Sequence, residues 1–298
     1  MMEQVKQSGL ILQSIGGFYY VETADAVYEC KARGVFRKEH IIPLSGDRVT
    51  ITVQADGTGI LEDILPRRNS LVRPPIANVD CLAIVTSVAE PKPNLQLVDK
   101  LIAIAENAAI EPIVVITKSD LDDTAQLESI YRGAGFRLFV VTNTSEISAA
   151  ELKAFLQGKV TAFTGNSGVG KSSLLNLIDA SLCRETGEIS KKLGRGRHTT
   201  RSVVLLPLSG GGYLADTPGF SALDMERTQP IDKDALFDCF REFQPYFGKC
   251  RFTGCSHVHE PDCAIRTAVE TGEISRSRYE SYVAMHEEAK LRKPWESI

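Results

Sequence analysis

Hydrophobic and polar positions follow two patterns along the chain, and the change comes near Val79. Before it, short alternating runs predict strands separated by turn residues such as Gly16-Gly17 and Asp56-Gly57. The five predicted strands are Leu10–Ile15, Phe18–Val21, Ala26–Cys30, Asp47–Val53 and Gly59–Leu65. Five short strands in this segment predict a small β-barrel such as an OB-fold. The prolines and arginines between Pro66 and Pro75 are typical of a linker.

After Val79, strand-like runs alternate with runs at helical spacing. The predicted strands are 80–88, 112–117, 137–142, 160–164, 203–208 and 213–215, and the predicted helices are 95–109, 122–133, 148–156 and 171–178. Such alternation predicts a parallel sheet wrapped by helices, with ligands at the carboxyl ends of the strands. Beyond about residue 225, the spacing predicts two more helices, Ile231–Phe243 and Ser275–Lys290.

Composition narrows the class of protein. The 298 residues are 43% apolar and carry a formal net charge of −4. A protein that coats nucleic acid indiscriminately is usually basic, so any RNA contact here needs local basic patches. No run of eighteen apolar residues and no apolar signal core are present, which predicts a cytoplasmic protein with no membrane partner. A monomer is the default expectation.

The strongest chemical signal is a glycine-rich segment between a predicted strand and a predicted helix. It reads Gly165-Asn166-Ser167-Gly168-Val169-Gly170-Lys171-Ser172 and is followed by Ser173. Backbone N–H groups of such a loop and the helix N-terminus bind phosphate, Lys171 is expected at the β- and γ-phosphates, and Ser172 is expected on Mg²⁺. Lys171 is therefore also a candidate catalytic residue.

Two further motifs complete a nucleotide site. Asp216-Thr217-Pro218-Gly219 ends the strand 213–215, so Asp216 is expected to hold Mg²⁺ through water and Gly219 to sense the γ-phosphate. Thr117-Lys118-Ser119-Asp120 ends the strand 112–117, where Asp120 is expected to accept two hydrogen bonds from guanine. The alternative for Asp120 is a helix cap in a surface turn. Thr142-Asn143 is expected to supply a backbone contact to the guanine oxygen.

The order of these motifs is permuted. The base motif at 117–120 precedes the phosphate loop at 165–172 and the D-x-x-G motif at 216–219. A sheet tolerates such a change of chain ends when the original ends lie close together. The segment that responds to hydrolysis then leads directly into the C-terminal region, and we hypothesise that the nucleotide state steers that region.

A cysteine cluster follows near the C-terminus. Cys250, Cys255, His257 and Cys263 offer three thiolates and one imidazole, a complete tetrahedral set for one structural zinc ion. His259 is a possible substitute for His257. The alternative is a group of reduced cysteines beside a surface histidine.

The combination resembles the small ribosomal subunit biogenesis GTPase RsgA family (YjeQ/YloQ-like). The matching stretches are TKSD, GNSGVGKSSLLN, GRGRHTT, DTPGF and CRFTGCSHVHEPDCAI. The resemblance implies a multidomain chain with an OB-fold over 1–66, a circularly permuted α/β P-loop GTPase domain over 67–225, and a helical zinc-binding domain over 226–298. It also implies GTP and GDP as ligands, the small ribosomal subunit and its rRNA as partners, and ribosome-stimulated GTP hydrolysis in late subunit maturation.

Within that resemblance, three residues bear on hydrolysis. Phe220 stands where many GTPases carry a water-orienting Gln, so slow hydrolysis by the free protein is expected. His198 is a candidate to position water, and the alternative is an RNA-contacting or solvated histidine. Thr200, with Thr199 as an alternative, is the candidate switch threonine on Mg²⁺. Basic patches that fit an RNA partner are Lys191, Lys192, Arg195, Arg197 and Arg201; Arg67, Arg68 and Arg73; and Lys290, Arg292 and Lys293.

Two rival functions fit parts of the sequence. The first is a kinase-like metabolic enzyme that uses ATP or GTP and carries a structural zinc. The Thr117–Asp120 motif counts against it. The second is an RNA-binding scaffold with a vestigial nucleotide site, and the intact Lys171, Ser172 and Asp216 count against that.

Overall fold

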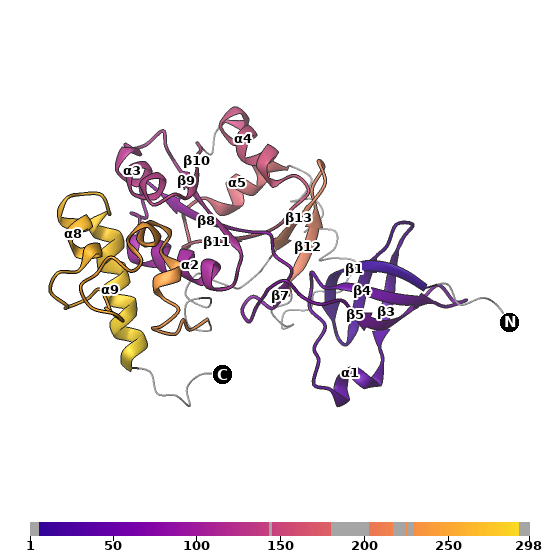
Figure 1. Cartoon of the computed structure of the whole chain (residues 1–298). Helices are drawn as coiled ribbons and strands as arrows, with labels where there is room; N and C mark the ends of the chain where they lie inside the picture. Colours follow the sequence, from indigo (N-terminus) through magenta and orange to yellow (C-terminus); the bar gives the residue numbers. More distant parts are fainter. Residues whose placement is uncertain (1–5, 143–144, 180–202, 217–224, 226–228, 292–298) are drawn as a thin grey trace. The chain divides into compact units, whose positions relative to one another are not determined.

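The computed structural model describes residues 6–142, 145–179, 203–216, 225 and 229–291 (Figure 1). The chain forms two compact units, each assembled from segments that are far apart in sequence. The first unit comprises Met1–Cys81, Lys153–Phe163 and Asp179–Phe220, and the second comprises Leu82–Leu152, Thr164–Ile178 and Ser221–Ile298.

The first unit begins with a closed barrel. Its strands are β1 (Lys6–Ile15), β2 (Phe18–Glu22), β3 (Val27–Ala32), β4 (Arg48–Val53) and β5 (Gly59–Ile64). Hydrogen bonds follow the order β1-β2-β3-β5-β4, and pairing of β1 with β4 closes the ring. The interior side chains are fully buried, as alternation requires. The predicted five-stranded barrel is confirmed.

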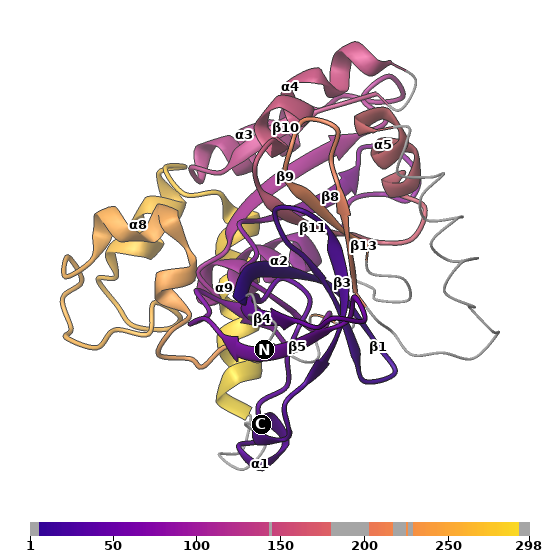
Figure 2. The ribbon, with the colours of Figure 1, turned by 90° about the vertical axis from the view of Figure 1, so that its right-hand side faces the viewer.

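A short helix, α1 (Gly34–Lys38), follows β3 and was not predicted. Its one buried side chain, Phe36, joins the barrel core. Figures 1 and 2 both show α1 beyond the strand ends, at one end of the barrel. Five residues are too few to give a readable helical period, so the sequence carried no signal for α1.

The proline-rich segment after the barrel is folded, so the linker prediction is wrong. It contains the strands β6 (Ser70–Leu71) and β7 (Ile76–Ala77), which pair with each other. Arg67 donates two hydrogen bonds, of 2.7 and 2.8 Å, to the fully buried carboxylate of Asp47. Arg68 pairs with Asp80 at 2.7 Å. Both arginines are therefore ion-paired within the fold, although the Arg68 side chain remains 61% exposed.

The first unit also contains three strands from the second half of the chain. They are β11 (Val160–Thr164), β12 (Val204–Pro207) and β13 (Tyr213–Asp216). β13 pairs in parallel with β11 and antiparallel with β12, and β12 reaches β1 through Val204 opposite Gln13. Ala162 of β11 is paired with Ala215 of β13, so the next residues along the two strands, Phe163 and Asp216, lie beside each other. The phosphate loop begins shortly after Phe163, at Gly165.

Three sheet strands of the second unit are paired in the order β10-β9-β8. Its strands are β8 (Cys81–Ser87), β9 (Glu111–Thr117) and β10 (Arg137–Val140), and β9 and β10 run parallel. Every residue of β8 is buried, as expected for a parallel sheet covered on both faces. The predicted helices appear as α2 (Leu95–Asn107), α3 (Ala125–Gly133), α4 (Glu146–Leu156) and α5 (Lys171–Ile178).

The C-terminal region corrects one predicted helix and confirms another. The continuous helix expected over 231–243 is wrong, because this stretch holds the short 3-10 turns η1 (Phe237–Cys239) and η2 (Arg241–Tyr246). Phe240 between them is extended, with φ −118° and ψ 95°, and Pro245 removes a backbone donor. The predicted last helix is confirmed as α9 (Arg276–Leu291), while α8 (Ala264–Glu270) was not predicted.

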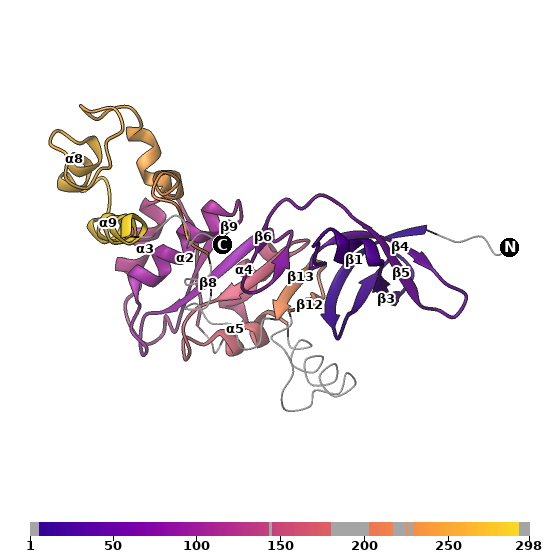
Figure 3. The same cartoon turned by 90° about the horizontal axis from the view of Figure 1, so that it is seen from below.

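Helix α9 packs against α2, and Figure 3 views α9 nearly end-on. Arg278 of α9 is fully buried and binds Asp99 of α2 at 2.9 Å and Glu242 of η2 at 2.7 Å. This charged cluster fastens the C-terminal region to a helix of the sheet domain. No helix in the described ranges combines the length and apolar character that crossing a bilayer requires.

Candidate functional site

The phosphate loop turns sharply between β11 and α5, as its glycines require. Gly165, Gly168 and Gly170 have φ values of 147°, 81° and 91°. A Cβ on Gly165 would lie 2.3 Å from the carbonyl oxygen of Val85, closer than atoms can approach. No other residue fits Gly165, so the loop backbone is fixed against β8.

Lys171 at the start of α5 already lies over this loop. Its Nζ donates to the carbonyl oxygens of Gly165 at 2.6 Å and Asn166 at 2.7 Å. Burial lowers the pKa of the ammonium group, because partial removal from water disfavours its charge. Ser172 and Ser173 are exposed on the first helical turn, beside the N–H groups that attract anions. The arrangement can receive a phosphate chain.

The base motif is tied directly to the phosphate loop. Thr117 is fully buried at the end of β9, and its hydroxyl lies 2.5 Å from the Val169 carbonyl oxygen and 3.1 Å from that of Thr86. This single side chain therefore joins β8, β9 and the loop. A hydroxyl is sufficient for that contact, so Thr can occupy the position where the predicted base motif more usually has Asn.

Lys118 follows in the left-handed region, with φ 58°, a conformation that Gly or Asn adopts more readily. Its Nζ donates to the carbonyl oxygen of Glu90. Pro91, next along the chain, lies 3.5 Å from where a Cβ of Gly168 would stand. The segment after β8 therefore flanks both motifs. The sequence analysis did not assign this segment to the site, although a loop that follows a buried parallel strand is a common place for ligand binding.

The remaining candidates for the base site are found in different environments. Asp120 is exposed, and the Ser119 N–H donates to the Val141 carbonyl oxygen at 3.4 Å. The Thr142 N–H, proposed as a guanine contact, donates at 3.1 Å to the Ser148 hydroxyl. Asn143 lies outside the described residues.

The second unit thus contains the candidates from Thr117 to Asp120 and from Gly165 to Ser173. Asp216 belongs to the first unit. His198, Thr200 and Gly219 lie outside the described residues. The roles assigned to all of these residues stay predictions.

The structure brings the four residues of the cysteine cluster together in an arrangement that could hold a metal ion. The ligand atoms of Cys250, Cys255, His257 and Cys263 all lie within 4.8 Å of one another. His257 Nδ1 is 3.4 Å from both Cys250 Sγ and Cys263 Sγ, and those two sulfurs are 3.9 Å apart. A tetrahedral ion with the usual zinc bond lengths needs sulfur–sulfur edges of about 3.8 Å and sulfur–nitrogen edges of about 3.5 Å. The donor set fits zinc. His259 is exposed outside the cluster, so it is not the substitute ligand.

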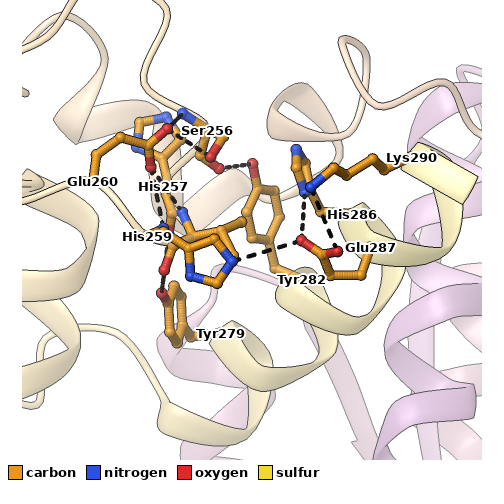
Figure 4. Close-up of polar contacts among 10 residues, drawn as sticks. Ser256, His257, His259, Glu260, Tyr279, Tyr282, His286, Glu287 and Lys290 are labelled. Carbon is orange, nitrogen blue, oxygen red and sulfur yellow. Dashed lines mark hydrogen bonds and ion pairs between the residues drawn. The ribbon is translucent and has the colours of Figure 1, made fainter.

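Groups around the cluster hold its loops in place (Figure 4). Tyr279 and Tyr282 of α9 donate at 2.9 Å to the carbonyl oxygens of His257 and Ser256. Glu260 accepts from the backbone and hydroxyl of Ser256; burial acts to raise its pKa, but these hydrogen bonds outweigh burial and lower it to about 2. Burial raises the pKa of Cys255 to about 12 in the absence of metal. A metal ion bound here would stabilise the thiolate form of its cysteine ligands.

Comparison with known proteins gives a consistent result. Residues 64–226 match the family model described as RsgA GTPase, and residues 8–61 match the RsgA N-terminal domain. The small ribosomal subunit biogenesis GTPase RsgA of Caldanaerobacter subterraneus subsp. tengcongensis is 47% identical, with 97% of both chains covered. The RsgA of Alkaliphilus metalliredigens is 42% identical, with 95% of this chain and 97% of the relative covered.

Two solved structures are also similar. The crystal structure of YjeQ from Thermotoga maritima superposes with a TM-score of 0.83 at 35% identity, covering 97% of this chain and 100% of that one. YloQ, described as a circularly permuted GTPase, superposes with a TM-score of 0.80 at 37% identity, covering 97% of each chain.

Proposed function

The chain belongs to the RsgA GTPase family, and we propose that it hydrolyses GTP on the small ribosomal subunit during late maturation of that subunit. The family is one of GTP-hydrolysing enzymes, so the kinase-like rival is not supported. The proposed partners are GTP and GDP, the small subunit and its rRNA, and the proposed setting is a cytoplasmic monomer. We retain 1–66, 67–225 and 226–298 as the proposed domain boundaries.

One contact carries the nucleotide assignment: the hydroxyl of Thr117 lies 2.5 Å from the carbonyl oxygen of Val169. It supports the proposal because it links a base motif and a phosphate motif that are separated in the chain and reversed in order. Asp120 then accepts hydrogen bonds from guanine, and the stem of Lys118 covers the base face.

The phosphate groups are bound by the loop N–H groups and by Lys171. Ser172, Thr200 and Asp216 would hold Mg²⁺, which supplies positive charge to the phosphate oxygens. Phe220 carries no group that polarises water, so hydrolysis by the free protein is slow. His198 orients the attacking water when the protein is bound to the small subunit.

Zinc in the Cys250, Cys255, His257 and Cys263 site has a structural role. These four protein donors would fill the coordination positions that structural zinc usually takes and would leave none for a substrate. The metal stabilises a region whose described elements are short turns and two helices.

Steady-state GTP turnover with and without purified small ribosomal subunits tests the proposed function. We expect turnover to rise when subunits are added, and to be absent for Lys171→Ala in both conditions. The same subunits should leave ATP turnover unchanged. Equal GTP turnover with and without subunits would contradict the proposal, and transfer of phosphate to a small molecule would restore the kinase-like rival.

A further inference from the structure

A cavity with aromatic walls opens beside the cysteine cluster, in the part of the second unit that follows residue 230. Its volume is about 510 Å³, within the range of about 300–1,000 Å³ typical of ligand pockets. Metal ligands such as Cys250 and His257 line it, but so do Lys233, Phe247 and Phe252, which are not metal ligands. A single ion between the four donors leaves the rest of the cavity to a second occupant.

The cavity wall includes the two most exposed phenylalanines of the described chain. Phe247 is 76% exposed and Phe252 is 46% exposed. A third ring, Phe237, continues this wall, with its centre 5.9 Å from that of Phe247 and 5.2 Å from that of His257. Exposed aromatic side chains that share one cavity are typical of a surface that a partner covers.

Two carboxylates line the same cavity. Asp234 and Asp238 are exposed, and neither forms an ion pair with another described residue. Lys233 is the only lysine or arginine among the described lining residues. With zinc bound, three thiolates against one doubly charged ion would add a further negative charge. The cavity therefore carries a net negative charge, which favours a cationic ligand.

Hydrogen bonds tie one of these carboxylates to the exposed ring. Asp238 accepts a hydrogen bond from the Gln244 side chain at 3.3 Å, and the Gln244 carbonyl oxygen accepts from the Phe247 N–H at 3.1 Å. Asp238 also follows Phe237, whose ring contacts that of Phe247. A carboxylate and an aromatic face are thus presented together.

The same region already contains one cation bound in this way. The Arg251 guanidinium lies 5.6 Å from the centre of the Phe252 ring and binds Asp262 at 2.7 Å. A guanidinium is planar, so it can stack on a ring while its N–H groups bind a carboxylate. Arg251 itself does not line the cavity, and no cation of the described residues lies over the Phe247 ring.

We infer that this cavity binds an arginine side chain of a protein partner: the guanidinium stacks on Phe247, and Asp234 and Asp238 accept its hydrogen bonds. A nucleic-acid backbone would bring phosphate charge against these carboxylates, which is unfavourable. An apolar side chain would bury the carboxylates without a partner for them, which is also unfavourable. The inference goes beyond the proposed function and does not depend on it.

Fluorescence anisotropy of the full-length, zinc-loaded protein with a labelled peptide of Gly-Arg-Gly repeats tests this site. A peptide with citrulline in place of each arginine is the matched ligand control, because citrulline has nearly the same shape without the charge. We expect the arginine peptide to bind more tightly. Phe247→Leu should weaken its binding about 2- to 30-fold, because a cation–ring contact is lost, whereas Phe247→Tyr keeps the ring and should bind like the wild type.

A second pair of variants tests the carboxylates. Asp238→Asn should weaken binding of the arginine peptide about 2- to 5-fold, because it removes the charge and keeps the shape. Asp232→Asn is the matched control, since Asp232 is an exposed carboxylate of the same segment that does not line the cavity. Elemental analysis of each variant shows whether the zinc is retained. If Phe247→Leu loses zinc, the comparison of Asp238→Asn with Asp232→Asn decides.

Four results would overturn the inference. The first is equal binding of the citrulline and arginine peptides, and the second is wild-type affinity in a Phe247→Leu variant that retains zinc. The third is an equal loss of affinity in Asp232→Asn and Asp238→Asn. The fourth is weaker binding of a labelled single-stranded RNA by Phe247→Leu, which would assign the cavity to nucleic acid. None of these results involves GTP turnover, so this inference and the proposed function can fail separately.

Discussion

Arg278 gives the sharpest prediction about what holds the C-terminal region to the sheet domain. Its guanidinium is fully buried, binds the equally buried Asp99 at 2.9 Å, and binds Glu242, which is 5% exposed, at 2.7 Å. It also lies 4.5 Å from the ring centre of Phe240. Among the described residues, Arg278 is the only cation that forms an ion pair with Asp99 or Glu242. Arg278→Ala therefore leaves two buried carboxylates without a positively charged partner.

Removal of one partner from a buried ion pair costs about 3–5 kcal/mol of unfolding free energy. In a domain of this size each kcal/mol shifts the melting temperature by roughly 2–4 °C, so a shift of about 6–20 °C is expected. The matched control is Arg132→Ala, because Arg132 pairs with Glu128 on the surface of α3, with side chains 55% and 32% exposed. That change should cost about 0.3–0.5 kcal/mol and shift the melting temperature by no more than about 2 °C.

The pH dependence of the melting temperature distinguishes an unpaired buried carboxylate from a loss of side-chain packing. Burial raises the pKa of Asp99, and the charge of Arg278 opposes that rise. Without Arg278 the folded-state pKa of Asp99 rises further above its unfolded value. The protonated carboxyl then stabilises the variant at low pH, and that stability is lost as the pH rises through the folded pKa. Differential scanning calorimetry should show a deficit that shrinks on acidification. A variant that melts within about 2 °C of the wild type would refute the reasoning, as would a large deficit independent of pH.

Three further changes test the two sites. Gly165→Ala should abolish GTP binding in a titration, because its Cβ would meet the Val85 carbonyl oxygen at 2.3 Å, whereas Gly57→Ala, at an open turn, should leave binding intact. Cys255→Ser should lower bound zinc and C-terminal helicity, measured by elemental analysis and circular dichroism, and His259→Ala should retain both; unchanged metal content in Cys255→Ser would exclude the site. His198→Ala should lose subunit-stimulated turnover while GTP binding stays normal, and retained stimulation would contradict its assigned role.

Local chemistry in the sequence was sufficient to predict the barrel, the alternating sheet domain and the four-ligand cysteine cluster. Each of these depends on a short period or a short motif: strand alternation, the glycine-rich loop, and four donors between Cys250 and Cys263. The strand bounds agree with the structure to within a few residues because turn residues mark them.

Features that depend on distant partners could not be predicted. Arg67 looked like part of a linker because its partner, Asp47, belongs to the preceding barrel. Apolar spacing over 231–243 suggested a helix, but the packing of Phe240 and Phe243 against Tyr282 of α9 is made by 3-10 turns instead. Tertiary contacts override local helical spacing in such short stretches.

The most direct test of the central claim is calorimetric titration of the wild-type protein with GDP and with ADP. Asp120 bonded twice to guanine should contribute about 3–6 kcal/mol that adenine cannot provide, so GDP should bind at least about 100-fold more tightly than ADP. Asp120→Ala should remove most of that preference while the Lys171 loop still binds phosphate. Equal affinities for GDP and ADP in the wild type would contradict the claim that Thr117–Asp120 and the phosphate loop form one guanine-nucleotide site.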